Sequence, residues 1–199
     1  MAATSVSSPL ALAVLPQSRA GRLAGMVALA VVGAAILWIS AKVKVPFYPV
    51  PMTLQTLALF LIAATYGSRL AVATVGLYLL EGVLGFPVFA GTPEKGIGIA
   101  YMFGPTGGYL AGYLVAAAIV GYAAEQSWGR RLFGLGAAML AGEFAILGLG
   151  FAWLATLIGA DKAFAFGVAP FLFADMVKVA LAAALSTAAG NLVGRGRST

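Results

Sequence analysis

The sequence predicts an all-α integral membrane protein with six transmembrane helices, and three observations support this fold class. Among 199 residues there are only 12 Lys and Arg and 6 Asp and Glu, so 9% of the chain is charged, against about 25% in soluble domains. The mean hydropathy is +1.01 and 62% of the residues are hydrophobic. Apolar stretches of about 20 residues, the length of a spanning helix, follow one another along the chain. A soluble enzyme is therefore excluded.

The composition also excludes several kinds of site. The chain has no Cys and no His, which rules out disulfides, Cys/His metal sites, thiol nucleophiles and His-based triads. The net charge is +6, but the basic residues are scattered between apolar blocks rather than clustered as in a nucleic-acid-binding surface. We therefore expect no metal, no cofactor, no nucleic acid partner and no enzymatic activity, and a lipid bilayer as the environment.

The first three predicted helices occupy the N-terminal part of the chain. Residues 23–41 form a charge-free stretch that ends before Lys42. Residues 45–51 contain three prolines, which predict an extended loop leading into the second helix, at 52–67. The third helix is predicted at 69–85, and the prolines and glycines of the following FPVFAGTPEKG indicate a loop.

The last three predicted helices are longer than the first three. The fourth is expected from Thr106 to Glu125, after a glycine-rich turn. The fifth covers residues 131–158. The sixth runs over residues 170–193, with Pro170 at the first helical position, where proline is well tolerated.

The remaining residues are predicted to be tails. Residues 1–20 have no basic residue before Arg19, so they lack the charged start of a secretory signal and are expected to be a disordered cytoplasmic tail. Residues 21–194 make up the six-helix transmembrane domain, and residues 195–199 form a cytoplasmic C-terminal tail. Counting basic residues in the loops gives seven Arg on the N-terminal side against four Lys on the other, which favours both termini inside a bacterial inner membrane.

Four ionisable side chains lie inside predicted spans, where a charge is costly unless it is paired or hydrated. Asp175 and Lys178 are three positions apart and share a helix face, so they are either a structural ion pair or a pair that binds ligand N–H and carbonyl groups. For Glu81 and Glu143 a structural role is favoured. Glu81 is the better ligand candidate of these two, because it lies one turn from Tyr78.

The residues alone leave three classes of function open. In the predicted topology the second, fourth and sixth helices begin on the outside, and three such helix N-termini around one cavity suit an anionic group. Three kinds of protein could use that site: a binding subunit for an ATP-driven machine, a proton-coupled carrier using Glu81 or Glu143, and an intramembrane enzyme. The enzyme is the weakest, because the chain shows no catalytic constellation and no Walker A pattern.

Four sequence segments, in this order and spacing, resemble the BioY family of biotin-specific S components of energy-coupling-factor (ECF) transporters. They read VPMTLQTL, LYLLEGVLGFPVFAG, GPTGGYLAGY and PFLFADMVK, and the resemblance covers most of residues 23–190. It implies the six-helix S-component fold, capture of biotin from outside, and ATP-driven uptake with a transmembrane coupling protein and ABC-type ATPases. A homo-oligomer is left open, and a proton-coupled carrier for a small organic acid is the alternative.

The resemblance also implies roles for particular residues. Asp175 and Lys178 would contact the bicyclic head of biotin, and the loops at 45–51 and 91–104 would close over it. The expected ligand-binding set is Asp175, Lys178, Glu81, Tyr78, Gln55, Gly91, Tyr109 and Phe47, with Tyr48 and Phe86 as further candidates for apolar walls. The small residues Ala24, Ala28, Ala30 and Ala34 of the first helix would form the face that docks on the coupling protein.

Overall fold

The structure is a computed structural model and describes residues 9–12, 15–46, 48–94 and 96–195. Its elements, in chain order, are α1 (Arg19–Lys42), β1 (Lys44–Val45), β2 (Met52–Thr53), α2 (Gln55–Tyr66), α3 (Ser68–Val83), α4 (Ile99–Met102), α5 (Gly107–Glu125), a 3₁₀ turn (Trp128–Arg130), α6 (Leu132–Ile158), α7 (Ala160–Gly167) and α8 (Leu172–Arg195). The described residues therefore form the helices that the sequence predicts, together with one short hairpin that it does not.

The six longer helices, α1, α2, α3, α5, α6 and α8, coincide with the six predicted segments to within a few residues. Within the described residues, four of them are long and apolar enough to cross a membrane: α1, α5, α6 and the Leu172–Leu192 part of α8. Helices α2 and α3 have 12 and 16 residues, or about 18 Å and about 24 Å at 1.5 Å per residue. Both are shorter than the roughly 30 Å hydrocarbon layer.

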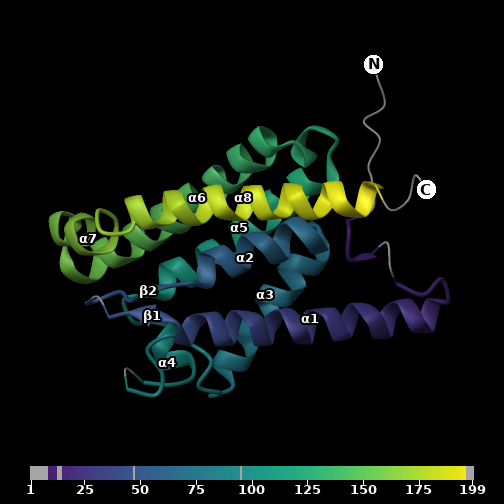
Figure 1. Cartoon of the computed structure of the whole chain (residues 1–199). Coiled ribbons are helices and arrows are strands. Elements are labelled where there is room, and N and C mark those ends of the chain that lie inside the picture. The colour runs from purple at the N-terminus through teal and green to yellow at the C-terminus, as the bar shows by residue number, and fades with distance from the viewer. Residues whose placement is uncertain (1–8, 13–14, 47, 95, 196–199) are drawn as a thin grey trace.

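Helix α5 is the centre of the bundle. Figure 1 shows α1 along one side and α8 along the opposite side, with α2, α3 and α5 between them. Helix α5 packs most extensively on α6, and glycines permit the close approach: a Cβ atom at Gly108 would lie 2.3 Å from the Leu149 carbonyl oxygen, and one at Gly112 would lie 2.6 Å from Ile146 Cα. Small residues at such contacts are typical of membrane helix packing.

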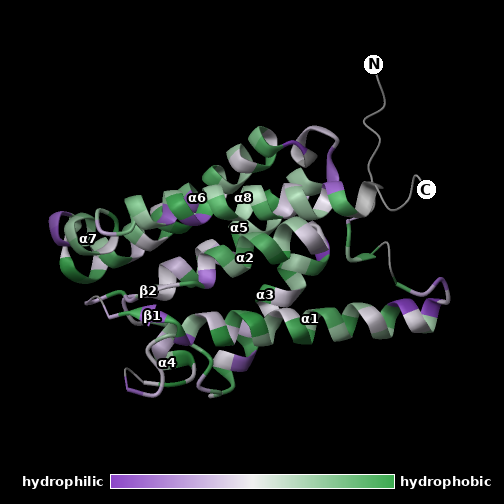
Figure 2. Ribbon diagram, in the orientation of Figure 1, coloured by the Kyte–Doolittle hydropathy of each residue, from purple (hydrophilic) through white to green (hydrophobic). Residues whose placement is uncertain are grey.

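The apolar surface of the bundle matches a membrane environment. In Figure 2 hydrophobic residues cover the lengths of the helices, and hydrophilic residues gather mainly at their ends and in the connections. Only 22% of the most apolar window of α1, and the same share of that of α8, is buried inside the protein. The outer faces of these two helices are therefore available to lipid or to a partner protein.

A carboxylate from α5 stabilises the sharp corner between α2 and α3. Gly67, which joins the two helices, has a φ of 78°, a conformation that favours glycine. The N-terminus of α3 has no side-chain cap of its own. Instead, Glu125 Oε1 accepts hydrogen bonds from Ser68 N at 2.8 Å and Ser68 Oγ at 3.0 Å.

The connections are more ordered than the sequence suggests. The predicted loop at 45–51 belongs to a hairpin in which Lys44 pairs with Thr53 and Val45 with Met52. Helices α4 and α7 lie in segments predicted to be loops. In the N-terminal segment, which is predicted to be disordered, Ser18 caps α1 and Ala11 N donates a hydrogen bond to Thr65 O at 3.1 Å.

Candidate functional site

An internal cavity lies where the hairpin, the loop before α5 and the start of α8 meet. It offers about 50 Å³ to the centres of water molecules, room for a few waters at roughly 10–15 Å³ each. The lining comes from the hairpin, α2, the connection after α3, α4, α5, α6 and the start of α8: Val50, Pro51, Thr53, Gln55, Thr56, Phe89, Ala90, Tyr101, Thr106, Tyr109, Leu110, Tyr113, Glu143, Ile146, Leu147, Phe171, Asp175 and Lys178. Three helix N-terminal regions contribute, those of α2, α5 and α8, as the sequence predicts.

Asp175 and Lys178 form a buried ion pair in this cavity. Lys178 Nζ lies 2.8 Å from Asp175 Oδ1. The Lys178 side chain is 12% exposed and the Asp175 side chain is 3% exposed. Asp175 is in the first turn of α8, where its N–H donates to Phe171 O at 2.8 Å. A buried pair is favourable only when further hydrogen bonds satisfy its remaining atoms, and the ammonium has three donors of which Asp175 takes one. The pair is therefore placed to bind a polar ligand.

Glu143, from the middle of α6, brings a second carboxyl group to the same cavity. It is 1% exposed, and neither of its side-chain oxygens has a hydrogen-bond partner among the described residues. A buried polar group without a partner costs about 1–3 kcal/mol. Of Glu143 and Glu81, Glu143 is thus the better candidate for a ligand contact. Glu81, which the sequence favoured, is only half-buried and does not line the cavity.

Gln55 is the first residue of α2 and lines the cavity. Tyr78 lies outside the lining and holds the Gln55 side chain in place. Gln55 Nε2 donates to the Tyr78 hydroxyl at 2.7 Å and lies 3.4 Å from Leu37 O. The Tyr78 hydroxyl in turn donates to Val88 O at 3.3 Å. Tyr78 is therefore a positioning residue, because it is fully buried but is not part of the lining.

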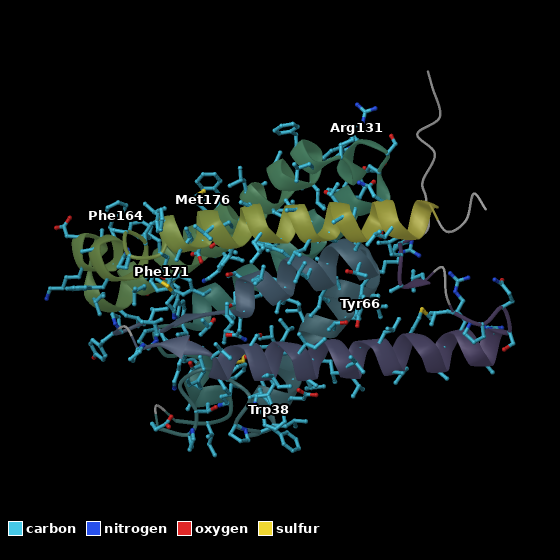
Figure 3. The ribbon with its side chains drawn as sticks, in the orientation of Figure 1. Trp38, Tyr66, Arg131, Phe164, Phe171 and Met176 are labelled. Carbon is cyan, nitrogen blue, oxygen red and sulfur yellow. The ribbon has the colours of Figure 1, made fainter. Side chains whose placement is uncertain are left out.

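Aromatic side chains form the apolar walls. The Tyr109 hydroxyl donates to Gly167 O at 2.7 Å, and the ring centre lies 6.5 Å from that of Phe171. Gly150 makes room for Tyr109, since a Cβ atom there would lie 2.3 Å from its ring. In Figure 3 Phe171 lies at the junction of α7 and α8, and it is 6% exposed, whereas Phe164 is 53% exposed.

The other predicted contacts fall outside the lining. Tyr48 and Phe86 are 84% and 58% exposed, so they are not walls of this cavity. Gly91 is one residue beyond the lining, and its N–H donates to the Tyr101 hydroxyl at 3.0 Å. Phe47 lies outside the described residues.

Two tyrosines of the lining are absent from the predicted set. Tyr113 could have been predicted from the sequence as a cavity residue, because it lies four positions after Tyr109 and so shares its helix face. Tyr101 was not, because it enters the cavity from α4, within a segment that sequence patterns describe only as a loop.

The four alanines of α1 do not form one face. Ala24 and Ala28 are exposed, Ala30 is half-buried, and Ala34 is fully buried. At 3.6 residues per turn, Ala28 and Ala30 are about 200° apart around the helix. Ala24 and Ala28 are therefore the most exposed of the four.

Known proteins resemble this chain over most of its length. Two relatives named for biotin transport are the probable biotin transporter BioY of Pyrococcus horikoshii, 37% identical over 74% of this chain and 85% of the relative, and the biotin transporter BioY of Thermotoga maritima, 38% identical over 76% and 88%. A crystal structure of the S-component for biotin from an ECF-type ABC transporter matches with a TM-score of 0.73, over 88% of this chain and 95% of that chain at 19% identity. The fold is therefore shared.

The family assignment rests on the sequence. The family model described as the BioY family matches residues 11–195, which include all the described elements from α1 to α8. The relatives above are more than 30% identical, and this chain covers most of their length. The chain belongs to the BioY family.

Proposed function

We propose that this chain is the membrane-embedded S component that captures biotin from outside for ATP-driven uptake. Its relatives are named biotin transporters, and its fold is that of a biotin S component. The observation that carries the proposal is the set of polar groups in the cavity: one ammonium from Lys178 and two carboxyl groups from Asp175 and Glu143. Family membership favours a transport role over catalysis.

These groups complement the bicyclic head of biotin. Its ureido ring carries two N–H donors and one carbonyl acceptor, so Asp175 and Glu143 would accept the N–H groups while Lys178 donates to the carbonyl oxygen. The sulfur-containing ring would lie against Tyr109, Tyr113 and Phe171. The valerate carboxylate would be favoured by the helix N-termini that meet at the cavity, which carry partial positive charge.

We also infer how the chain crosses the membrane. Six spans, with α2 and α3 crossing as short helices, would place both termini in the cytoplasm and the cavity in the outer half of the bacterial inner membrane. The partners would be a coupling protein that docks on α1 and a pair of ABC-type ATPases. Protease accessibility of tags at the two termini in oriented vesicles tests this topology.

A panel of competing vitamins tests which ligand the protein binds. We expect the purified protein to bind radiolabelled biotin, desthiobiotin to compete because it keeps the ureido ring, and other vitamins not to compete. The competitor concentrations that halve biotin binding are the measurement. Equal competition by vitamins that lack a ureido group would contradict the proposal.

Glu143 provides a second prediction. Glu143→Leu removes both acceptor oxygens, and we expect biotin affinity to fall about 5-fold to 150-fold, because a buried ligand N–H left without an acceptor costs about 1–3 kcal/mol. Glu143→Gln keeps one acceptor and should lose less. Equilibrium binding to the purified variants measures both, with Glu81→Gln as the matched control outside the cavity.

The same residue decides the alternative function, a proton-coupled carrier for a small organic acid. Its buried carboxyl group, which has no hydrogen-bond partner in the part of the chain that the structure describes, is the feature such a carrier would need. In that case a pH gradient would drive uptake into vesicles without any ATPase, and Glu143→Gln would remove it. Uptake that requires the ATPases would exclude this alternative.

A further inference from the structure

Residues 88–92 close one side of the cavity without belonging to a helix or a strand. All five are buried, and Phe89 and Ala90 line the cavity. Buried backbone carbonyl groups need hydrogen-bond donors, which a helix or a sheet would normally supply. Here much of that requirement is met by two lysine side chains from a distant part of the sequence.

Lys42 and Lys44, which we call the lysine pair, donate to the carbonyl oxygens of this segment. Lys42 Nζ, in the last turn of α1, lies 2.9 Å from Phe89 O and 3.2 Å from Thr92 O, and also 3.3 Å from Thr92 Oγ1. Lys44 Nζ, in β1, lies 2.7 Å from Ala90 O. Hydrogen bonds from a charged donor are stronger than neutral ones, so the pair holds the segment firmly.

Residues 88–92 include Phe89, whose side chain forms part of the cavity wall. The Phe89 ring is stacked on Tyr101 with centres 5.0 Å apart and meets Tyr78 edge-on at 5.5 Å. Gly82 leaves room for the Phe89 ring, since a Cβ atom at Gly82 would lie 1.9 Å from it. Displacement of residues 88–92 would therefore remove Phe89 and open the cavity.

The cavity is too small for a vitamin to enter or leave unless a wall moves. It offers only about 50 Å³ to water centres, and most of its lining belongs to helices that are packed in the bundle. Residues 88–92 can move by breaking hydrogen bonds to the side chains of Lys42, Lys44, Tyr78 and Tyr101, without unfolding a helix. They are thus a part of the lining that can move while the helices of the bundle stay packed.

We propose that Lys42 and Lys44 are positioning residues that hold residues 88–92 closed over the bound ligand and thereby set its dissociation rate. The inference rests on the proposed binding of biotin in this cavity. The lysine pair itself does not line the cavity, and it acts through the backbone of the segment that does. Loss of the pair therefore changes how fast the ligand leaves while the ligand's own polar contacts stay in place.

The test compares Lys42→Met, Lys44→Met and the double variant with Lys162→Met. Lys162 is the matched control because it is an exposed lysine of α7, and in the described part of the chain only Lys42 and Lys44 among the lysines donate to residues 88–92. After a chase with unlabelled biotin, we expect labelled biotin to dissociate on the order of tenfold faster from each single variant and faster still from the double variant. Dissociation at the wild-type rate from the double variant would overturn the proposal.

Amide hydrogen exchange without ligand gives an independent readout. Residues 88–92 should exchange faster in the double variant than in the wild type or Lys162→Met, while the amides of α5 and α6 keep their protection. Unchanged exchange in the segment would overturn the proposal, and so would faster exchange that spreads over the whole bundle. If the wild-type protein fails to bind biotin, the proposed function is wrong, while exchange still decides whether the lysine pair holds the segment.

Discussion

Asp175→Asn and Lys178→Ala are each expected to abolish tight biotin binding. The two side chains form the buried ion pair of the cavity, with Nζ and Oδ1 2.8 Å apart. Removal of one partner takes away a charged ligand contact, and loss of such a buried contact costs about 2–5 kcal/mol of binding free energy. The corresponding loss of affinity is about 30-fold to several thousand-fold. Equilibrium binding of labelled biotin to the purified variants measures it.

Controls separate lost recognition from lost folding. Asp161→Asn and Lys162→Met make the same charge changes in α7, but both residues are exposed and neither lines the cavity. These variants should bind biotin like the wild type. Thermal unfolding in detergent shows whether the α8 variants remain folded, and the double variant Asp175→Asn, Lys178→Met removes both charges at once. Wild-type affinity in the folded single variants would disprove the site.

The positions of the six longer helices were predictable because charges and prolines interrupt the apolar stretches at their ends. Lys42 ends α1, and the prolines before α2 prevent an earlier start. Helix length was less predictable. The corner at Gly67 and the cap from Glu125 fix where α2 and α3 meet, and both features depend on packing between distant segments.

The ion pair of the site was predictable from spacing alone, whereas the role of Glu143 was not. Asp175 and Lys178 share a helix face at three-residue spacing, so their contact follows from helix geometry. A single acid such as Glu143 has no such partner in the sequence. Which neighbours it meets depends on how α6 is rotated against α5, and that rotation is set by contacts such as that of Gly112 with Ile146.

The walls of the cavity depend on contacts between distant residues. Tyr109 occupies space left by Gly150, and Phe89 occupies space left by Gly82. In the sequence these glycines look like many others in an apolar helix. The small-residue pattern of α1 also depends on the angle around the helix, because the pair Ala24 and Ala28 lies on a different face from the pair Ala30 and Ala34.

A tryptophan at Ala28 is expected to prevent assembly with the coupling protein while biotin binding survives. Ala28 and Ala24 lie on the exposed side of α1. The opposite side packs on α3, where a Cβ atom at Gly33 would lie 2.6 Å from Thr74 Cγ2. An added indole at Ala28 therefore meets no residue of this chain's core, but it would keep a closely packed partner helix away.

Co-purification of the tagged coupling protein with Ala28→Trp measures the effect, and we expect recovery to fall at least tenfold, because close helix packing tolerates little added volume. Ala184→Trp is the matched control, the same change at an exposed alanine of α8 on the opposite side of the bundle. Ala34→Trp should behave differently, since Ala34 is fully buried and overpacking there should unfold the protein and remove biotin binding as well. Normal recovery of the complex with Ala28→Trp, together with loss in Ala184→Trp, would place the docking surface on α8 instead of α1.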